Sequence, residues 1–485
     1  MKFVRAIMAL LAAASCGTSS PAQDAGHEPR RVLFVNVNVF DGIDENLMRR
    51  ANVLVEGNLV IRVTVDPVQA GDTTVIDGGG RTMIPGLIDM HWHSAYASIP
   101  MAVGLSSDHA YHTLIAAKSN ERVLLRGFTT VRDVGGNVFS LQKLTDAGVY
   151  TGPRIFPSGP AISQTSGHVD FRPATAVPAD PGAPLIYMER IGHVMVADGV
   201  PALLQRVREA LRMGASQIKI NSGGGVSSSF DPLDVTQFTV EETEAAVAAA
   251  ADWNTYVATH VFTDDATQRA IRAGVMSIEH GHLLSEPTLR LMKERGAFLS
   301  MQPILDDEDA IPFPEGSFSR QKFIEVTEGT DRVYRLAREI GVKTVFGTDC
   351  LFDPELAEKQ GKLLTKLGRW YTPVEALRQA TSTAGELLAL SGPRNPYPDG
   401  PLGVIREGAY ADLILVNGNP LEDLDLIADA EANFDLIMKD GKIYKNQIDG
   451  RAGAQDDGLE QVRALARDLQ AADRGVYRFF RRTPR

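Results

Sequence analysis

Short apolar runs alternate with helix-patterned stretches over most of this chain of 485 residues. Such alternation is typical of βα units, in which helices join parallel strands. Eight runs are predicted to be strands, and they occupy residues 83–93, 127–135, 154–162, 216–224, 256–262, 276–281, 297–303 and 343–350. The pattern therefore predicts an α/β protein built on a (β/α)8 TIM-type barrel, which we expect over residues 85–401.

Helix start signals support this alternation. Thr239 with Glu242, and Thr372 with Glu375, fit the capping box, in which a hydroxyl and a carboxylate three residues on each accept a bond from the other's backbone amide. We therefore expect a helix to follow Thr239 and another to follow Thr372.

The segments on either side of the predicted barrel have a different pattern. Residues 31–84 and 402–447 are rich in short β-type runs with Gly and Asp-Gly turns, and we expect them to form one small β-sandwich domain split in sequence by the barrel. In residues 448–485, apolar side chains recur with helical spacing. This tail is predicted to dock on the barrel or on a neighbouring subunit, which leaves a homo-oligomer open, and a membrane anchor is the alternative.

The first 22 residues have the layout of an export signal. Lys2 and Arg5 precede an apolar run, and small residues follow it. Cys16 stands where a bacterial lipoprotein is cleaved and lipidated, whereas Ala22 ends an ordinary cleavage site, so both routes remain open. We expect an exported protein, either periplasmic or tethered to a membrane through Cys16. Cys350 is left without a predicted disulfide partner.

Composition and charge restrict the class of protein. The chain is 44% hydrophobic and 23% charged, as in ordinary globular proteins, and its formal net charge is −12. A basic face for nucleic acid would be hard to assemble on that background, so nucleic acid is not an expected partner.

Two histidines end the first predicted strand of the barrel. His91 and His93 are two residues apart, and residues with that spacing on a strand point to the same face. Two neutral imidazoles on one face can bind a metal ion. A His-x-His pair alone is weak evidence, so the prediction of a metal site depends on further ligands.

Further ligand types stand at the ends of other predicted strands, namely Lys219, His260, His280 and Asp349. Catalytic residues of such barrels come from the carboxyl ends of several strands. An unpaired ammonium inside a barrel is costly, but an amine that has reacted with carbon dioxide is an anionic carbamate that can bridge two metals. A lysine that is paired with a carboxylate or reaches the rim is the alternative for Lys219.

These motifs resemble those of the amidohydrolase superfamily, in its binuclear branch with a carboxylated lysine. The resemblance rests on HWH at 91–93, QIKI at 217–220, IEHG at 278–281, GTD at 347–349 and the flanking runs PGLIDMH and GVIREGAYADLILVNGNPL. It implies two divalent metal ions, with Zn²⁺ expected, that share a hydroxide acting as the nucleophile. It also implies that His91, His93, Lys219 and Asp349 hold one ion, and that the Lys219 carbamate, His260 and His280 hold the other. Asp349 would pass the proton to the leaving amine.

Within the superfamily, TTVRDVGG at 129–136 and SGHVD at 166–170 resemble the imidazolonepropionase-like group, which includes Xaa-Pro dipeptidases and amidases acting on ochratoxin-type amides. The resemblance implies a small peptide or N-acyl amino acid as the substrate. We expect His168 to contact a carboxylate or carbonyl of that substrate. Arg132 is predicted to help, and its pairing with Asp133 or another carboxylate of the barrel wall is the alternative.

Three segments are expected to shape the pocket. Residues 223–225 are interpreted as a tight glycine turn that lets the backbone approach the metals. The long connections at 171–200 and 303–330 are expected to roof the pocket.

Two other functions stay open. A mononuclear deaminase or cyclic-amide hydrolase would use the same fold, although it would not need the bridging carbamate of Lys219. A non-catalytic exported binding lipoprotein is the other alternative, although its ligand set would be expected to have lost a member.

Overall fold

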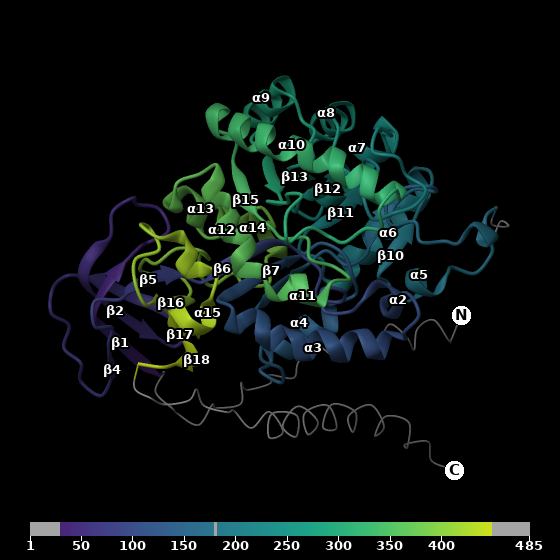
Figure 1. Cartoon of the computed structure of the whole chain (residues 1–485). Coiled ribbons are helices and arrows are strands. Elements are labelled where there is room, and N and C mark those ends of the chain that lie inside the picture. Colours follow the sequence, from purple (N-terminus) through teal and green to yellow (C-terminus); the bar gives the residue numbers. More distant parts are fainter. Residues whose placement is uncertain (1–29, 179–181, 449–485) are drawn as a thin grey trace, which may run out of the picture.

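The computed structural model describes residues 30–178 and 182–448 of the chain. The predicted export signal with Cys16 and the predicted C-terminal helix lie outside these residues. The described part is an α/β protein with two parallel sheets and one mixed sheet (Figure 1).

The parallel strands form two sheets. The smaller sheet has the order β6 (Leu87–Trp92), β7 (Phe128–Asp133) and β8 (Arg154–Pro157). The larger sheet has the order β10 (Val194–Val196), β9 (Ala161–Ser163), β11 (Ile218–Asn221), β12 (Val257–Val261), β13 (Ser277–His280), β14 (Phe298–Met301) and β15 (Thr344–Phe346). Every predicted run contains a strand. The first run covers most of β5 (Thr82–Pro85) as well as β6, the third run reaches one strand in each parallel sheet, and β10 was not predicted.

Backbone hydrogen bonds link the two parallel sheets. The amide of Asp349, just after β15, donates to the carbonyl of His91 on β6 over 2.8 Å. The amide of Ser216, just before β11, donates to Pro157 at the end of β8, also over 2.8 Å. The carboxyl ends of β6 and β15 are therefore adjacent.

Helices follow most of these strands. The longer ones are α3 (His109–Leu125), α4 (Phe139–Asp146), α6 (Val200–Met213), α7 (Val240–Ala251), α8 (Asp264–Ala273), α9 (Glu286–Arg295), α10 (Phe318–Ile340), α12 (Gln360–Thr365), α13 (Pro373–Gln379) and α14 (Ser382–Ala389). The short ones are α2 (Met101–Gly104), α5 (Tyr187–Arg190), α11 (Pro354–Glu358) and α15 (Ala430–Asn433), with 3-10 turns η1 (Ala174–Ala176), η2 (Lys366–Arg369), η3 (Gly392–Arg394) and η4 (Leu424–Ile427). None of the helices in the described ranges is long and apolar enough to cross a bilayer.

Both predicted capping boxes are confirmed. The Thr239 hydroxyl accepts from the Glu242 amide over 3.3 Å, and the Glu242 carboxylate accepts from the Thr239 amide over 2.8 Å, at the start of α7. Thr372 and Glu375 make the same pair of bonds at the start of α13.

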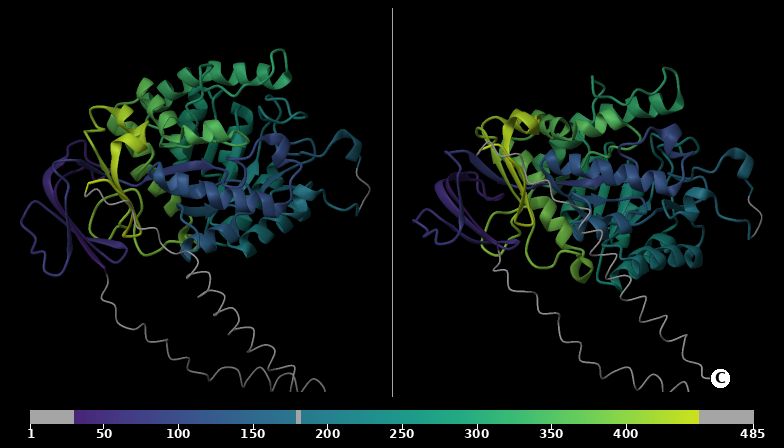
Figure 2. Two further views of the ribbon diagram at one scale, coloured as in Figure 1. Left: turned by 60° about the horizontal axis from the view of Figure 1, so that its bottom comes forward. Right: turned by 90° about the horizontal axis from the view of Figure 1, so that it is seen from below.

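The two flanking segments share the mixed sheet. Its strands are β1 (Arg31–Val39), β2 (Met48–Glu56), β3 (Leu59–Thr64), β4 (Thr74–Asp77), β5 (Thr82–Pro85), β16 (Leu413–Val416), β17 (Phe434–Lys439) and β18 (Lys442–Asn446). The join is the antiparallel pairing of β5 with β16, which brings the purple and yellow ends of the described chain side by side (Figures 1 and 2).

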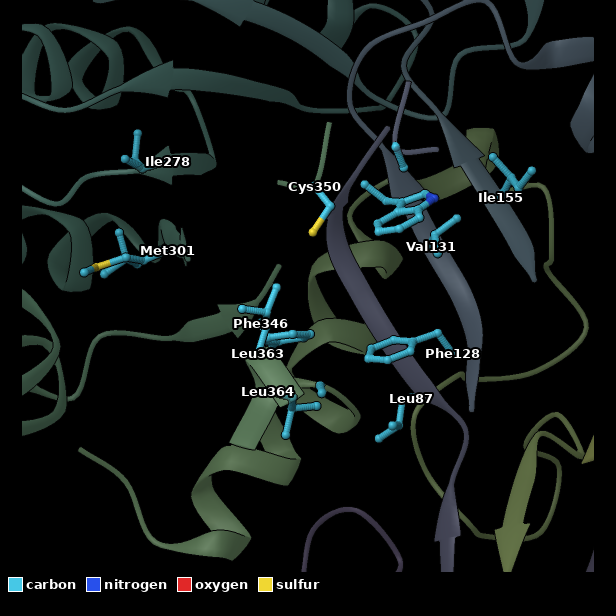
Figure 3. Packing of buried hydrophobic residues seen from close by; sticks show 14 of the residues in the cluster. Leu87, Phe128, Val131, Ile155, Ile278, Met301, Phe346, Cys350, Leu363 and Leu364 are labelled. Atoms are coloured by element: carbon cyan, nitrogen blue, oxygen red, sulfur yellow. The ribbon is translucent and has the colours of Figure 1, made fainter. Parts of the chain in front are cut away.

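The main apolar core lies between the parallel strands and the helices. Leu87 on β6, Phe128 on β7 and Phe346 on β15 are fully buried in it (Figure 3). Cys350 lies in the same cluster as a free, buried thiol, and burial raises its pKa. The apolar core therefore holds these strands in place, and the polar groups at their carboxyl ends lie outside it.

A buried ion cluster joins the smaller parallel sheet to the mixed sheet. Arg154 on β8 lies 3.3 Å from Asp412 and 2.6 Å from Asp440, and its guanidinium stacks on the ring of Tyr410. Burial alone would lower the pKa of Arg154, but these two carboxylates raise it. The guanidinium is therefore held charged at the junction.

We predict that Arg154→Met destabilises the protein by about 3–5 kcal/mol, because Asp412 would be left buried without its counter-charge. Thermal unfolding of the full chain measures the effect. Arg338→Met is the matched control, because the pair of Arg338 with Glu375 is exposed and is worth at most about 1 kcal/mol. Equal shifts in the two variants would contradict a special role for the buried pair.

Candidate metal centre

His91, His93 and Asp349 meet at the adjacent ends of β6 and β15. The Nε2 atoms of His91 and His93 lie 3.2 and 3.1 Å from the same oxygen, Oδ1 of Asp349. The two imidazoles therefore project to one face, as predicted. Burial would raise the pKa of Asp349, but its contacts with His91 and His93 hold that pKa well below its ordinary value.

His260 and His280 complete a ring of imidazoles from β12 and β13. Their ring centroids are 4.3 Å apart, and that of His280 lies 4.9 Å from that of His91. Burial lowers the pKa of both His260 and His280 well below the ordinary value. Both side chains are therefore neutral at physiological pH, which is the form that binds metal ions.

Each of the four imidazoles has one ring nitrogen occupied by a protein acceptor. The acceptors are the Glu279 carboxylate for His91 (2.9 Å), the Gly135 carbonyl for His93 (3.2 Å), the Gly224 carbonyl for His260 (3.1 Å) and the Gln302 side-chain oxygen for His280 (2.7 Å). Donation through one nitrogen fixes the tautomer and leaves a lone pair on the other. The set therefore presents four nitrogens as ligands.

Three donor groups already lie at ligand spacing. One ligand atom each from His91, His280 and Asp349 lies within 4.8 Å of the others, and this is the one such group among the described residues. The backbone of His280 and of Asp349 is left-handed, with φ of 75° and 54°. Left-handed non-glycine residues are uncommon and gather at functional sites, where the surrounding structure holds them in place.

Lys219 on β11 is buried, and β11 pairs with β12, the strand that carries His260. Burial lowers its pKa to about 8, against the opposing charges of Glu279 and Asp349. The described residues form no hydrogen bond with its ammonium that would account for its burial. A buried amine with a lowered pKa is partly neutral at physiological pH, as a nucleophilic amine must be.

The structure corrects the role predicted for Arg132. Its side chain is fully buried on β7 and donates to Glu279 over 2.6 Å and to the carbonyl of Met90 over 2.6 Å. It is therefore paired with a carboxylate of the wall and does not reach a substrate. This was the alternative that the sequence left open.

Glu279 is a functional residue that sequence reasoning missed. It lies between Arg132 and His91, and although burial would raise its pKa, the charge of Arg132 and the hydrogen bond from His91 hold it well below the ordinary value. Its position next to His280 in the IEHG motif was the available signal. Its contact with Nδ1 of His91 orients that imidazole.

His168 lies against His260 with stacked rings, 3.8 Å apart between centroids and inclined by 14°. Its Nδ1 contacts the Ser228 hydroxyl (2.6 Å) and the Asp231 carboxylate (3.2 Å), neither of which the sequence indicated. Gly225 is required beside it, because a Cβ there would lie 2.0 Å from His168 Nδ1. The glycine turn therefore leaves space for the His168 ring, and its approach to the metals stays a prediction.

A buried lysine holds the loop that supports His168. Lys322 on α10 donates to the carbonyls of Gly225, Ser228 (2.7 Å) and Asp231 (3.4 Å). The Asp231 carboxylate in turn accepts from the Gly225 amide over 2.7 Å. His168 is therefore positioned by side chains that are themselves fixed.

A cavity adjoins the centre. His168, His260, His280 and Asp349 line it together with residues from the 303–330 connection. That connection therefore shapes the pocket as predicted, whereas the described residues of the 171–200 connection contribute none of its lining.

Neutral imidazoles, a carboxylate and a buried lysine at the carboxyl ends of parallel strands are typical of metal-dependent α/β hydrolases. The amidohydrolase family model matches residues 82–453. Ochratoxinase from Aspergillus niger is 31% identical over 378 residues, which are 75% of each chain. The chain therefore belongs to the amidohydrolase family.

Solved structures agree. A prolidase in complex with N-methylphosphonate-L-proline is 35% identical, with a TM-score of 0.78 over 86% of this chain and 100% of the other. An Xaa-Pro dipeptidase with bound methionine is 30% identical, with a TM-score of 0.74 and the same coverage. The chain is an amide-hydrolysing, metal-dependent enzyme of the dipeptidase-like group, and the non-catalytic alternative is set aside.

We predict that Glu279→Gln weakens metal binding by about 10- to 100-fold, because the carboxylate that orients His91 is lost. Chelator competition with the purified protein measures the affinity. Glu286→Gln, which changes an exposed partner of Arg290, is the matched control and should bind metal as the native protein does. Native affinity in Glu279→Gln would contradict the orienting role.

Proposed function

We propose that this protein hydrolyses the amide bond of a small peptide or N-acyl amino acid that carries a free α-carboxylate. The observation that carries the proposal is the set of four imidazoles, each with one nitrogen occupied by a protein acceptor and the other left as a ligand, beside a cavity lined by His168. The proline analogue and the methionine bound by the two similar enzymes support a substrate of this size and class.

The donor set fits two divalent ions, with Zn²⁺ expected from its mixture of nitrogen and oxygen ligands. His91, His93, Lys219 and Asp349 would hold one ion, and Lys219, His260 and His280 the other. Bound ions would supply Lewis-acid polarisation of the scissile carbonyl and would lower the pKa of a water molecule enough for it to act as the nucleophile at neutral pH. A mononuclear deaminase or cyclic-amide hydrolase is the alternative, and metal stoichiometry separates the two.

Lys219 is proposed to carry the carbamate. Its neutral amine nitrogen forms a bond to the carbon of carbon dioxide and releases one proton, which leaves an anionic carbamate. The burial of Lys219 beside the ligands supports this, because an unmodified ammonium there would repel the ions.

The chain's own groups would then handle the proton and the substrate. Asp349 lies at the centre of the ligand set, where it would take a proton from the attacking water and donate it to the leaving nitrogen. An amide needs this step because an amine anion is a very poor leaving group. His168, with Nδ1 held by Asp231 and Ser228, would meet the substrate carboxylate through its other nitrogen.

We also infer that the two parallel sheets close into one (β/α)8 barrel and that the mixed sheet is a β-sandwich domain. The backbone bonds at Asp349 and Ser216 and the similar amidohydrolase structures support this. For the location, we propose export, with or without a lipid tether at Cys16, on the layout of residues 1–22. Cell fractionation of the full chain tests that location.

We predict that Lys219→Ala loses metal and activity together, because the anionic bridge between the two ligand groups is removed. Elemental analysis should give two divalent ions per native chain and fewer in the variant. Partial rescue of the variant by a short carboxylic acid would support the carbamate. One ion or none in a fully active native enzyme would contradict the binuclear proposal.

We predict that His168→Ala lowers kcat/KM by roughly ten- to a hundred-fold, because a charge-assisted hydrogen bond is worth about 1.5–3 kcal/mol. Amidation of the substrate carboxylate should cause a similar loss in the native enzyme. The two losses should not add, since they remove the same contact. If the native enzyme cleaves amidated and free substrates equally well, the substrate has no carboxylate contact and a cyclic amide becomes the better candidate.

A further inference from the structure

The cavity beside the candidate metal centre is too small for the proposed class of substrate. Its volume is about 80 Å³, and His260, His280 and Asp349 line it. Cavities that bind small organic molecules have volumes of roughly 300–1,000 Å³. Whichever half of a peptide or N-acyl amino acid enters this cavity, one wall of the cavity has to move.

One wall is the connection between β14 and α10. The side chains that it contributes to the cavity are Ile304, Leu305, Asp309, Ile311 and Phe313. In the described part of the chain, the backbone hydrogen bonds of residues 305–316 all stay within this connection, as from the Ala310 amide to the Asp307 carbonyl over 3.0 Å. Side-chain contacts therefore hold this wall in place.

Three consecutive carboxylates of this wall meet ammonium groups of the opposite wall, to which α11, α12 and η2 contribute. The pairs are Asp307 with Lys366 (2.8 Å), Glu308 with Lys362 (3.2 Å), and Asp309 with Lys359 (2.9 Å), Lys362 (2.9 Å) and Lys366 (3.1 Å). We call these six residues the latch cluster. The Asp309 side chain is fully buried, and buried ion pairs are far more costly to break than exposed ones. Asp309 therefore contributes most to holding the two walls together.

The lysine side of the latch cluster is anchored to the core. Leu363 and Leu364 on α12 lie in the main apolar cluster (Figure 3). Gln360 on the same helix is fully buried and donates to the Asp89 carboxylate on β6 over 2.8 Å. The connection after β14 has no comparable backbone anchor, so it is the wall that can move.

We propose that residues 305–316 form a gate over the cavity, held closed by the latch cluster, and that substrate reaches the candidate metal centre only when these ion pairs separate. The gate goes beyond the proposed function, and only the identity of what passes through it rests on that function. Opening is costly because Asp309 must leave three ammonium groups at once. Removing its charge should therefore leave the gate open for a larger fraction of the time.

Thiol labelling of the full chain measures this opening without any substrate. Leu363 lines the cavity on the anchored wall and is 4% exposed, so Leu363→Cys should react with a maleimide only when the gate is open. Adding Asp309→Asn, which keeps the shape of the side chain, should speed labelling at position 363 roughly ten- to a hundred-fold. Peptide mapping separates this reaction from any at Cys16 and Cys350.

Asp306→Asn is the matched control for the labelling. Asp306 belongs to the same connection, but its partner is Arg320 on α10, the helix that directly follows, at 2.8 Å. Labelling at position 363 should therefore keep its original rate. An unchanged rate with Asp309→Asn, or equal acceleration by the two substitutions, would overturn the latch.

A covalent bridge tests whether substrate has to pass the gate. Glu308→Cys and Lys362→Cys place two thiols at the exposed pair of the latch cluster, where a short bismaleimide can join them. The bridged, metal-loaded protein should lose nearly all hydrolysis with its metal content unchanged, whereas the unbridged double variant and the reagent-treated single variants stay active. Full activity after bridging would overturn the gate. If the native enzyme hydrolyses no amide, the proposed function fails, and the thiol labelling still decides whether the gate exists.

Discussion

The candidate metal centre depends on a buried ion pair that lies outside its set of proposed ligands. Arg132 and Glu279 are both fully buried, 2.6 Å apart, and the second carboxylate oxygen of Glu279 accepts from His91 over 2.9 Å. A buried pair of this kind loses several kcal/mol when one partner is removed, because the other is left uncompensated. Glu279 therefore has two roles. It neutralises the buried Arg132, and it fixes the orientation of His91.

The second constraint on the candidate metal centre is that its residues stand at the carboxyl ends of strands. Parallel strands bring their carboxyl ends to one edge, so residues far apart in the sequence meet there without long connections. His280 and Asp349 add a left-handed backbone, which redirects their side chains from the regular strand alternation. Glu279 and His280 would otherwise face opposite sides of β13, yet both contribute to the same centre.

The sequence predicted what depends on local pattern. The eight strand runs, both capping boxes and the meeting of His91, His93 and Asp349 follow from spacing and strand order, and the structure contains them. The role predicted for Arg132 was wrong, because an amino-acid sequence alone does not show which carboxylate lies opposite this arginine in the folded sheets. Glu279, Asp231 and Lys322 were missed for the same reason, since each acts through a contact more than about 60 residues away in sequence.

The proposed metal ligands and the proposed substrate contact are positioned by different parts of the fold. The proposed metal ligands stand on or directly after core strands, whereas His168 is held through the 225–231 loop by Lys322 on α10. A change in that loop can therefore alter the contact with the substrate while the strand-borne ligands keep their places. The same division fits a family that includes an ochratoxinase and a prolidase, because function is carried by sites added to a common fold. Under the proposed function, the loop and the cavity would govern the choice of substrate, and the residues at the strand ends would carry out the hydrolysis.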